Sequence, residues 1–253
     1  MTDPIQFNPE TYASLLSAAR DNSYRFIRFD EMKHYQQGKT CVLRHDIDAD
    51  LYAAHAIAKI DAWNGISSTF FVMLRSPLYN LFSRHNAWYV EQILSMGHNI
   101  GLHYDAAFSP KHNVNMHNAI YHEITILEEM FDTNVNAVSF HQPGEDILFG
   151  NVQIPHKINT YNTTDMCGFL YISDSNMRFK YENPFEVFSA GRYDHIHLLI
   201  HPLWWAYSNM ASPEDVWDMV IIHNFELSQR QLLQTEVVYG NPRTMSLQRG
   251  DIT

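Results

Sequence analysis

The sequence is poor in cysteine, in positive charge and in long apolar runs, and each shortage excludes a class of protein. Its 253 residues contain two cysteines, Cys41 and Cys167, which cannot build a disulfide framework. Seventeen Lys and Arg stand against 28 Asp and Glu, which gives a formal net charge of −11. Because nucleic acids and anionic membranes bind clustered positive charge, we expect neither as a partner.

Segments that would direct the chain to or across a membrane are also missing from the sequence. The longest apolar stretch, residues 196–205, is interrupted and is much shorter than the roughly 20 residues of a transmembrane helix. The first residues carry neither the basic nor the apolar region of a signal peptide. We therefore expect a cytoplasmic protein with no transmembrane segment.

What the sequence does have is a composition that suits a large core and a regular alternation of strands and helices. Hydrophobic residues make up 45% of the chain and aromatic residues 13%, and no repeat or linker interrupts it. The apolar patterns predict helices over 8–20, 50–64, 86–96, 114–131 and 213–236, and strands over 40–48, 67–74, 99–104, 135–141, 169–174 and 195–201. This alternation predicts parallel βαβ units and an α/β fold.

Five of the predicted strands end on Asp or His, and this is the most informative pattern in the sequence. In a (β/α) barrel the active site forms at the carboxyl ends of the strands. Solubility alone would favour Lys, Glu, Asn or Gly at such positions, whereas a repeated choice of Asp and His favours a metal or acid–base site. The residues concerned are Asp46 and Asp48, His103, His141, Asp174 and His201.

Asp46 and Asp48 are separated by one residue, so an extended strand places both carboxylates on the same face. Two close carboxylates do not both stay ionised in a dry site without a cation. A divalent metal bound by one of them would leave the other as a base. The alternative is that Asp48 caps the helix that begins near Asp50, which would not explain Asp46.

Together with one Asp, His103 and His141 would form a set of three ligands that leaves open positions for water and substrate, as in catalytic zinc sites. Asp105 is the other candidate for the third ligand. His201 precedes Pro-Leu-Trp-Trp and could act as a general acid or base. The adjacent Trp204 and Trp205 would either stack on a sugar ring or pack in the core.

The ordered set of motifs resembles the polysaccharide deacetylase (NodB-homology) family, in its branch with a His-Asp-x-Asp first motif found in surface-polysaccharide gene clusters. The matching segments are RHDIDADLYAAHAIAKI, GISSTFFVM, GHNIGLHYD, VSFHQPG, YISDS and LLIHPLWW, which span roughly residues 40–205. The resemblance implies a distorted (β/α) barrel and metal-dependent removal of an acyl group from a sugar. The continuous alternation of strands and helices without a linker predicts one domain over 1–253, with an N-terminal helical extension at 1–38, a catalytic core at 39–205 and a C-terminal helix and tail at 206–253.

By this resemblance, Asp46 is the general base, Asp48 and His103 are metal ligands, and His201 is the general acid, oriented by Asp174. The family's second metal-binding histidine would fall at position 107, which is Ala107 here, and His141 stands where the family has an arginine. We predict that His141 supplies the missing ligand; the alternatives are Asp105 as that ligand, or a His141 that only hydrogen-bonds Asp46. The predicted substrate-binding residues are Trp204, Trp205, Tyr104 and Arg44.

The sequence thus predicts a hydrolase that removes an acetyl or formyl group from the nitrogen of an amino sugar or glycan precursor. Its cofactor would be one divalent metal ion, zinc first, with cobalt, nickel, manganese or iron as alternatives. The substrate would be nucleotide-linked, lipid-linked or an oligosaccharide. Two rival hypotheses are a metal-free barrel that binds a glycan or partner, which Ala107 motivates, and a non-haem iron oxygenase, which the His103-x-Asp105 spacing motivates.

Overall fold

The structure is a computed structural model that describes residues 5–34, 37–208 and 210–236. The chain forms two compact units, Met1–Val216 and Trp217–Thr253. Nearly all described residues of the second unit belong to one helix, which ends at Thr235. On this helix Arg230 and Glu226 form an ion pair of 3.1 Å. Among the described residues, no helix has the length and apolarity needed to cross a bilayer.

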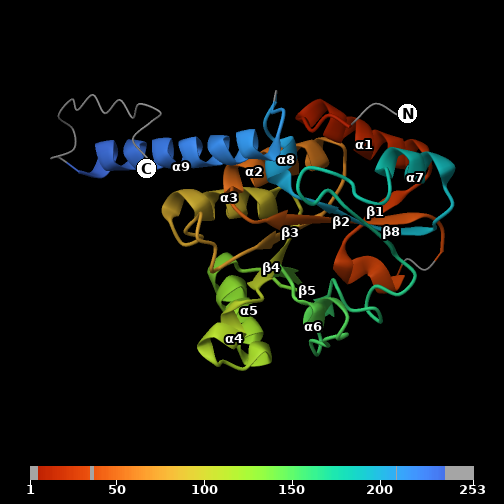
Figure 1. Ribbon diagram of the computed structural model, residues 1–253, viewed down its shortest axis with the longest axis horizontal. Helices are drawn as coiled ribbons and strands as arrows, with labels where there is room; N and C mark the ends of the chain where they lie inside the picture. Colours follow the sequence, from red (N-terminus) through yellow and green to blue (C-terminus); the bar gives the residue numbers. More distant parts are fainter. Residues whose placement is uncertain (1–4, 35–36, 209, 237–253) are drawn as a thin grey trace. The chain divides into compact units, whose positions relative to one another are not determined.

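The first unit is built on one parallel sheet of eight strands (Figure 1). The strands are β1 (Arg25–Ile27), β2 (Thr40–Ile47), β3 (Thr69–Val72), β4 (Asn99–Asp105), β5 (Ala137–His141), β6 (Ile158–Asn159), β7 (Leu170–Ser173) and β8 (His195–Ile200). Their order is β6-β5-β4-β3-β2-β8-β7, with β1 added beside β2. No pairing joins β6 to β7 in the described residues, so the predicted (β/α) barrel is confirmed in a distorted, open form.

Helices connect most of the strands, and several helices of the first unit pack against the sheet (Figure 1). The helices in the described residues are α1 (Pro9–Asp21), α2 (Leu51–Trp63), α3 (Arg84–Ser95), α4 (Phe108–His112), α5 (Met116–Phe131), α6 (Glu145–Leu148), α7 (Pro184–Ala190), α8 (Pro202–Trp205) and α9 (Pro213–Thr235), with a 3₁₀ helix, η1, at Phe29–His34. Side-chain caps fix where several of them begin: Asp50, for example, accepts a hydrogen bond from the backbone N–H of Tyr52 at 2.8 Å.

The alternation of side chains along β2 explains how the sheet separates its core from its site. All eight residues of β2 are buried, as expected for a central parallel strand. Leu43, His45 and Ile47 face the helices, whereas Val42, Arg44 and Asp46 face the barrel interior. Along this inner face the residues change from apolar to charged toward the carboxyl end of the strand.

An apolar floor closes the interior below the charged residues. It consists of Ile27, Phe29, Val42, Phe71 and Ala137. Phe71 lies against Gly101 on the neighbouring strand, where a Cβ atom would stand only 2.4 Å from the ring. A glycine is therefore required at position 101 for the ring to fill the floor beneath His103.

The long predicted elements all appear, with ends within a few residues of the expected ones. The sequence patterns missed β1, β6 and the short helices, which have too few residues to show a period. The predicted helix over 114–131 is preceded by a separate short helix, α4, that begins at Phe108. The domain boundaries at residues 38 and 205 stay predictions.

Candidate metal and catalytic site

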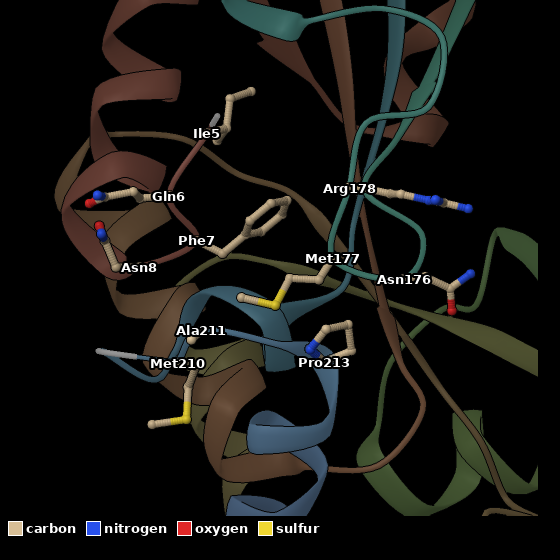
Figure 2. Close-up of a pocket in the computed structure, with 10 residues that line it drawn as sticks. All are labelled: Ile5, Gln6, Phe7, Asn8, Asn176, Met177, Arg178, Met210, Ala211 and Pro213. Carbon is tan, nitrogen blue, oxygen red and sulfur yellow. The ribbon is translucent and has the colours of Figure 1, made fainter. Parts of the chain in front are cut away.

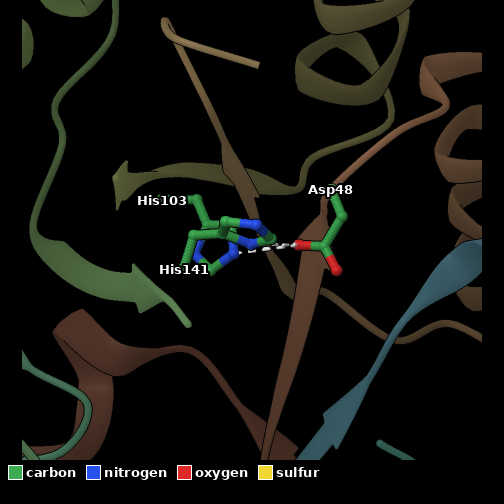
Figure 3. A group of neighbouring side chains, drawn as sticks. All are labelled: Asp48, His103 and His141. Atoms are coloured by element: carbon green, nitrogen blue, oxygen red, sulfur yellow. Dashed lines mark hydrogen bonds and ion pairs between the residues drawn. The ribbon is translucent and has the colours of Figure 1, made fainter. Parts of the chain in front are cut away.

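Three predicted side chains meet at the carboxyl ends of β2, β4 and β5. Nε2 of His103 lies 3.0 Å from Oδ1 of Asp48, and Nδ1 of His141 lies 3.2 Å from the same oxygen. The two imidazole rings are nearly perpendicular, at 82°. Figure 3 shows both rings directed at the Asp48 carboxylate from neighbouring strands. Asp48, His103 and His141 thus form a candidate ligand triad.

The triad fits a divalent cation by both geometry and chemistry. One ligand atom from each residue lies within 4.8 Å of the other two. Ligand atoms about 2.0–2.1 Å from a tetrahedral zinc stand about 3.3 Å apart, close to the contacts seen here. Two imidazoles and one carboxylate form a donor set typical of catalytic zinc, and Asp48 and His141 are partly exposed, so water could complete the coordination.

Asp46 lies one layer deeper and is held by a buried arginine. Nε and Nη2 of Arg44 donate to the two carboxylate oxygens of Asp46 at 2.8 and 2.6 Å. Arg44 is fully buried and also contacts the hydroxyl of Tyr161 at 3.0 Å. Burial by itself raises the pKa of Asp46, but the charge and hydrogen bonds of Arg44 together with the nearby His103 and His201 outweigh this and lower it. Asp46 is therefore ionised at neutral pH.

His201 and Asp174 form a second pair on the opposite side of Asp48. Nδ1 of His201 lies 2.6 Å from Oδ1 of Asp174, and Nε2 lies 3.9 Å from Oδ2 of Asp48. Nε1 of Trp205 donates to Asp174 at 2.7 Å, which fixes this carboxylate from behind. Burial lowers the pKa of His201, but the charge and hydrogen bond of Asp174 outweigh it and raise the pKa to about 9.

Within the triad, the Asp48 carboxylate and the His141 imidazole shift each other's pKa. Burial by itself raises the pKa of Asp48, yet hydrogen bonds from His103 and His141 hold it well below its usual value. The pKa of His141 is raised in turn, because Asp48 outweighs the effect of burial.

The four predicted substrate-binding side chains lie in the packing around the site. Tyr104 points to the helix side of β4, where its hydroxyl pairs with Ser109. Trp204 and Trp205 are 4% and 0% exposed, and Trp205 packs on Phe7. Arg44 is fully buried and donates two hydrogen bonds to the Asp46 carboxylate. All four side chains are buried, so none of them presents an exposed surface on which a sugar ring could stack.

Asp105 and His98 lie outside the triad. Asp105 ends β4 and accepts a hydrogen bond from the backbone N–H of Ala107 at 3.1 Å, which shapes the turn into α4. His98 contacts the carbonyl of Ala58 and the backbone N–H of Ser68, a structural position behind the sheet. Asp105 is not one of the converging ligands. His103 and Asp105 therefore do not form the paired ligands that the iron oxygenase hypothesis requires.

Sequence reasoning missed Ser139 and counted Arg44 among the substrate-binding residues, whereas Arg44 supports the site by binding Asp46. Ser139 lies two residues before His141 and contacts both His103 and Asp46. The period of two along β2 and β5 was the available signal, since it places Arg44 with Asp46 and Ser139 with His141 on the inner face.

A cavity of about 890 Å³ lies beside the His201–Asp174 pair (Figure 2). The N-terminal segment, the loop after β7 and residues 210–213 line it. Phe7 and Met177 face one another there, whereas the side chain of Arg178 extends away from Phe7. The ligand triad does not line this cavity, which adjoins the site through the contact of Phe7 with Trp205 and through Arg178, whose backbone N–H donates to the carbonyl of Asp174 at 3.2 Å.

Comparison with known proteins gives matches among solved structures only. No family model matches the chain, and no curated protein matches it significantly. One similar structure is a CE4 family pseudoenzyme from Bacillus anthracis, at 11% identity and a TM-score of 0.41, covering 76% of this chain and 63% of that one. The chain thus spans less than two thirds of that protein.

Two other similar structures carry deacetylase names. The peptidoglycan deacetylase PdaC from Bacillus subtilis has 13% identity and a TM-score of 0.42, covering 78% of this chain and 95% of that one. The chitin deacetylase from Colletotrichum lindemuthianum has 14% identity and a TM-score of 0.41, covering 75% and 84%. Similarities of this size do not establish an activity for this chain.

Proposed function

We propose that this protein is a metal-dependent hydrolase that removes an N-acyl group, acetyl or formyl, from an amino sugar or glycan precursor in surface-polysaccharide biosynthesis. The observation that carries the proposal is the convergence of a ligand triad, an ionised carboxylate and a carboxylate-paired histidine at the carboxyl ends of neighbouring strands. These are the groups that hydrolysis of an amide requires.

Asp48, His103 and His141 would hold the cation. A bound divalent ion supplies a Lewis acid that activates water and polarises the acyl carbonyl. Zinc is our first choice because the donor set is two nitrogens and one oxygen, and cobalt, nickel, manganese and iron accept the same ligands.

The protein's own groups would move the protons. Asp46, kept ionised by Arg44, accepts a proton from the attacking water as its oxygen bonds to the acyl carbon. His201, whose pKa is raised to about 9, is protonated at neutral pH and faces the site through Nε2. It gives its proton to the nitrogen as the carbon–nitrogen bond breaks, because an amide anion is too poor a leaving group to depart unprotonated. The products are the free amine and acetate or formate.

The test combines metal analysis with release of the acid. Purified protein should contain about one divalent ion per chain and release acetate or formate from an N-acylated amino sugar, presented free, nucleotide-linked, lipid-linked or as an oligosaccharide. Asp46→Asn should keep the metal and lose about 10²–10⁴-fold in rate, because it removes the base and leaves the ligands.

The control is Asp105→Asn, which alters a carboxylate at the end of β4 outside the triad and should change neither metal content nor rate by much. A chain that binds no metal would support the rival hypothesis of a non-catalytic binding barrel. A fully active Asp46→Asn variant would show that the base is assigned to the wrong residue.

A further inference from the structure

Ser139 occupies the centre of the site and takes no part in the proposed proton transfers. It lies on β5, directly opposite His103 in the parallel register, and is fully buried. Its Oγ stands 2.6 Å from Nδ1 of His103 and 3.3 Å from Oδ1 of Asp46. The hydroxyl therefore links a proposed metal ligand to the proposed base.

The directions of these two hydrogen bonds follow from what each group can donate. Both oxygens of Asp46 accept hydrogen bonds from the Arg44 guanidinium, at 2.8 and 2.6 Å, so this carboxylate acts as an acceptor and the proton of the Ser139 hydroxyl points to it. The oxygen of Ser139 then has lone pairs left for the N–H at Nδ1 of His103. With that proton on Nδ1, a neutral His103 carries its free lone pair on Nε2, the nitrogen that faces Asp48.

We propose that Ser139 is a positioning residue that fixes the tautomer and ring orientation of His103 as a metal ligand and ties it to Asp46. The inference rests on the proposed function only in taking the triad as a metal site. Hydrogen bonds to the second nitrogen of a ligating histidine typically change metal affinity by about 10–100-fold when removed. Loss of the hydroxyl would leave Nδ1 facing an apolar methyl group, so the ring could adopt the other tautomer or turn.

The fold contains a matched control for this residue. Ser68 is also fully buried, donates to the Asp61 carboxylate at 2.7 Å and lies 3.1 Å from Nδ1 of His98, on the helix side of the sheet. Ser68→Ala and Ser139→Ala therefore delete the same hydroxyl from the same kind of aspartate–histidine bridge. They differ in whether the histidine belongs to the ligand triad.

The experiment measures the dissociation constant of Co²⁺ for the full chain by competition with a chromophoric chelator, together with the visible spectrum of bound Co²⁺. Ser139→Ala should weaken Co²⁺ binding about 10–100-fold and change the spectrum. Ser68→Ala should leave both within about threefold of the parent, whatever it costs in thermal stability. Ser139→Thr, which keeps the hydroxyl, should restore the affinity.

Several outcomes would overturn the proposal. These are a folded Ser139→Ala that binds Co²⁺ like the parent, an equal loss in Ser68→Ala, or a Thr variant as weak as the Ala variant. If Ser139→Ala does not fold, long-range ¹H–¹⁵N spectra of the metal-loaded parent decide the point: the proposal requires the His103 proton on Nδ1, and a proton on Nε2 refutes it. A parent chain that binds no Co²⁺ would refute the metal site, and this result is distinct from all the others.

Discussion

Two histidine–aspartate clusters lie on opposite faces of the same sheet, and they differ in where their polar atoms point. In the outer cluster Asp61 accepts hydrogen bonds from Tyr12, His45 and Ser68, at 2.5, 2.8 and 2.7 Å, and each of these side chains is fully buried. In the inner cluster two imidazole nitrogens converge on one oxygen of Asp48, which is partly exposed. The carboxylate of Asp61 has its acceptors satisfied by protein donors, whereas the inner cluster has ligand atoms that converge on one point.

Residue type and spacing therefore do not separate a metal site from a structural network. His45 directly precedes Asp46 in the chain, yet it faces the helices and stacks on Phe70 at 4.3 Å. Shifting a side chain by one residue along a strand moves it from one face of the sheet to the other. Variants of Asp48, Asp61 and Asp174 test this division of roles.

The largest effect is expected for Asp48→Ala. This change removes the oxygen on which His103 and His141 converge, so the chain should lose its metal and its activity should fall below detection. His103→Ala should behave in the same way. Metal content of the purified variants and release of the acid product are the measurements.

Circular dichroism should show that the Asp48→Ala fold is intact, because Asp48 is partly exposed and belongs to no buried core cluster. Retention of one tightly bound ion by Asp48→Ala would mean that the cation is held elsewhere. The inner cluster would then lack the metal site that distinguishes it from the outer cluster.

Asp61→Ala should produce the converse result, a loss of stability without loss of the metal site. It leaves the hydroxyls of Tyr12 and Ser68 and the ring of His45 without their shared acceptor in a fully buried position. Breaking such a network typically costs about 3–5 kcal/mol in the free energy of unfolding. Urea unfolding measures the loss, and Co²⁺ titration of the folded variant should give the parent affinity.

A tenfold or greater change in Co²⁺ affinity for a folded Asp61→Ala would show that the two faces of β2 are energetically coupled. In that case the outer cluster could not be treated as a purely structural network.

The strand ends could be predicted from the sequence because a parallel sheet places the residues after each strand at one edge. This geometry predicted that Asp48, His103 and His141 would lie close together, as they do. The surroundings could not be predicted, since they depend on three-dimensional packing. Arg44 binds Asp46 because the pleat of β2 turns both side chains to the interior. Trp205 is buried because the short helix α8 places its indole against Asp174.

The fold was predictable where the apolar pattern runs long enough to show a period, as in α2 and β2, and not in the two-residue β6. The cavity beside Phe7 could not be foreseen either, because its walls come from three segments that are remote in sequence. The roles of the site residues and the identity of the metal stay predictions.

Asp174→Asn tests whether the inner cluster contains a proton donor as well as ligands, and its effect is the smallest of the three. In the metal-free protein the pKa of His201 is raised to about 9, against about 6.5 in an unfolded chain, by Asp174 and to a smaller extent by Asp48 and Asp46. A histidine whose pKa is higher in the folded state adds stability that is complete below about pH 6.5 and is lost as the pH rises through about 9. The shift corresponds to about 3 kcal/mol at most.

Replacing the carboxylate by an amide removes the charge, so the pKa of His201 in the variant should fall toward 6.5. The free energy of unfolding of metal-free parent and variant should then differ most at pH 6. Above pH 9 the difference should narrow to a remainder that no longer depends on pH, because the amide still accepts fewer hydrogen bonds from the backbone N–H of His201 and from Nε1 of Trp205. NMR titration of the His201 ring and urea unfolding at both pH values are the measurements. A parent pKa near 6.5, or a stability difference independent of pH, would remove the basis for treating His201 as the general acid and would leave it as another structural histidine.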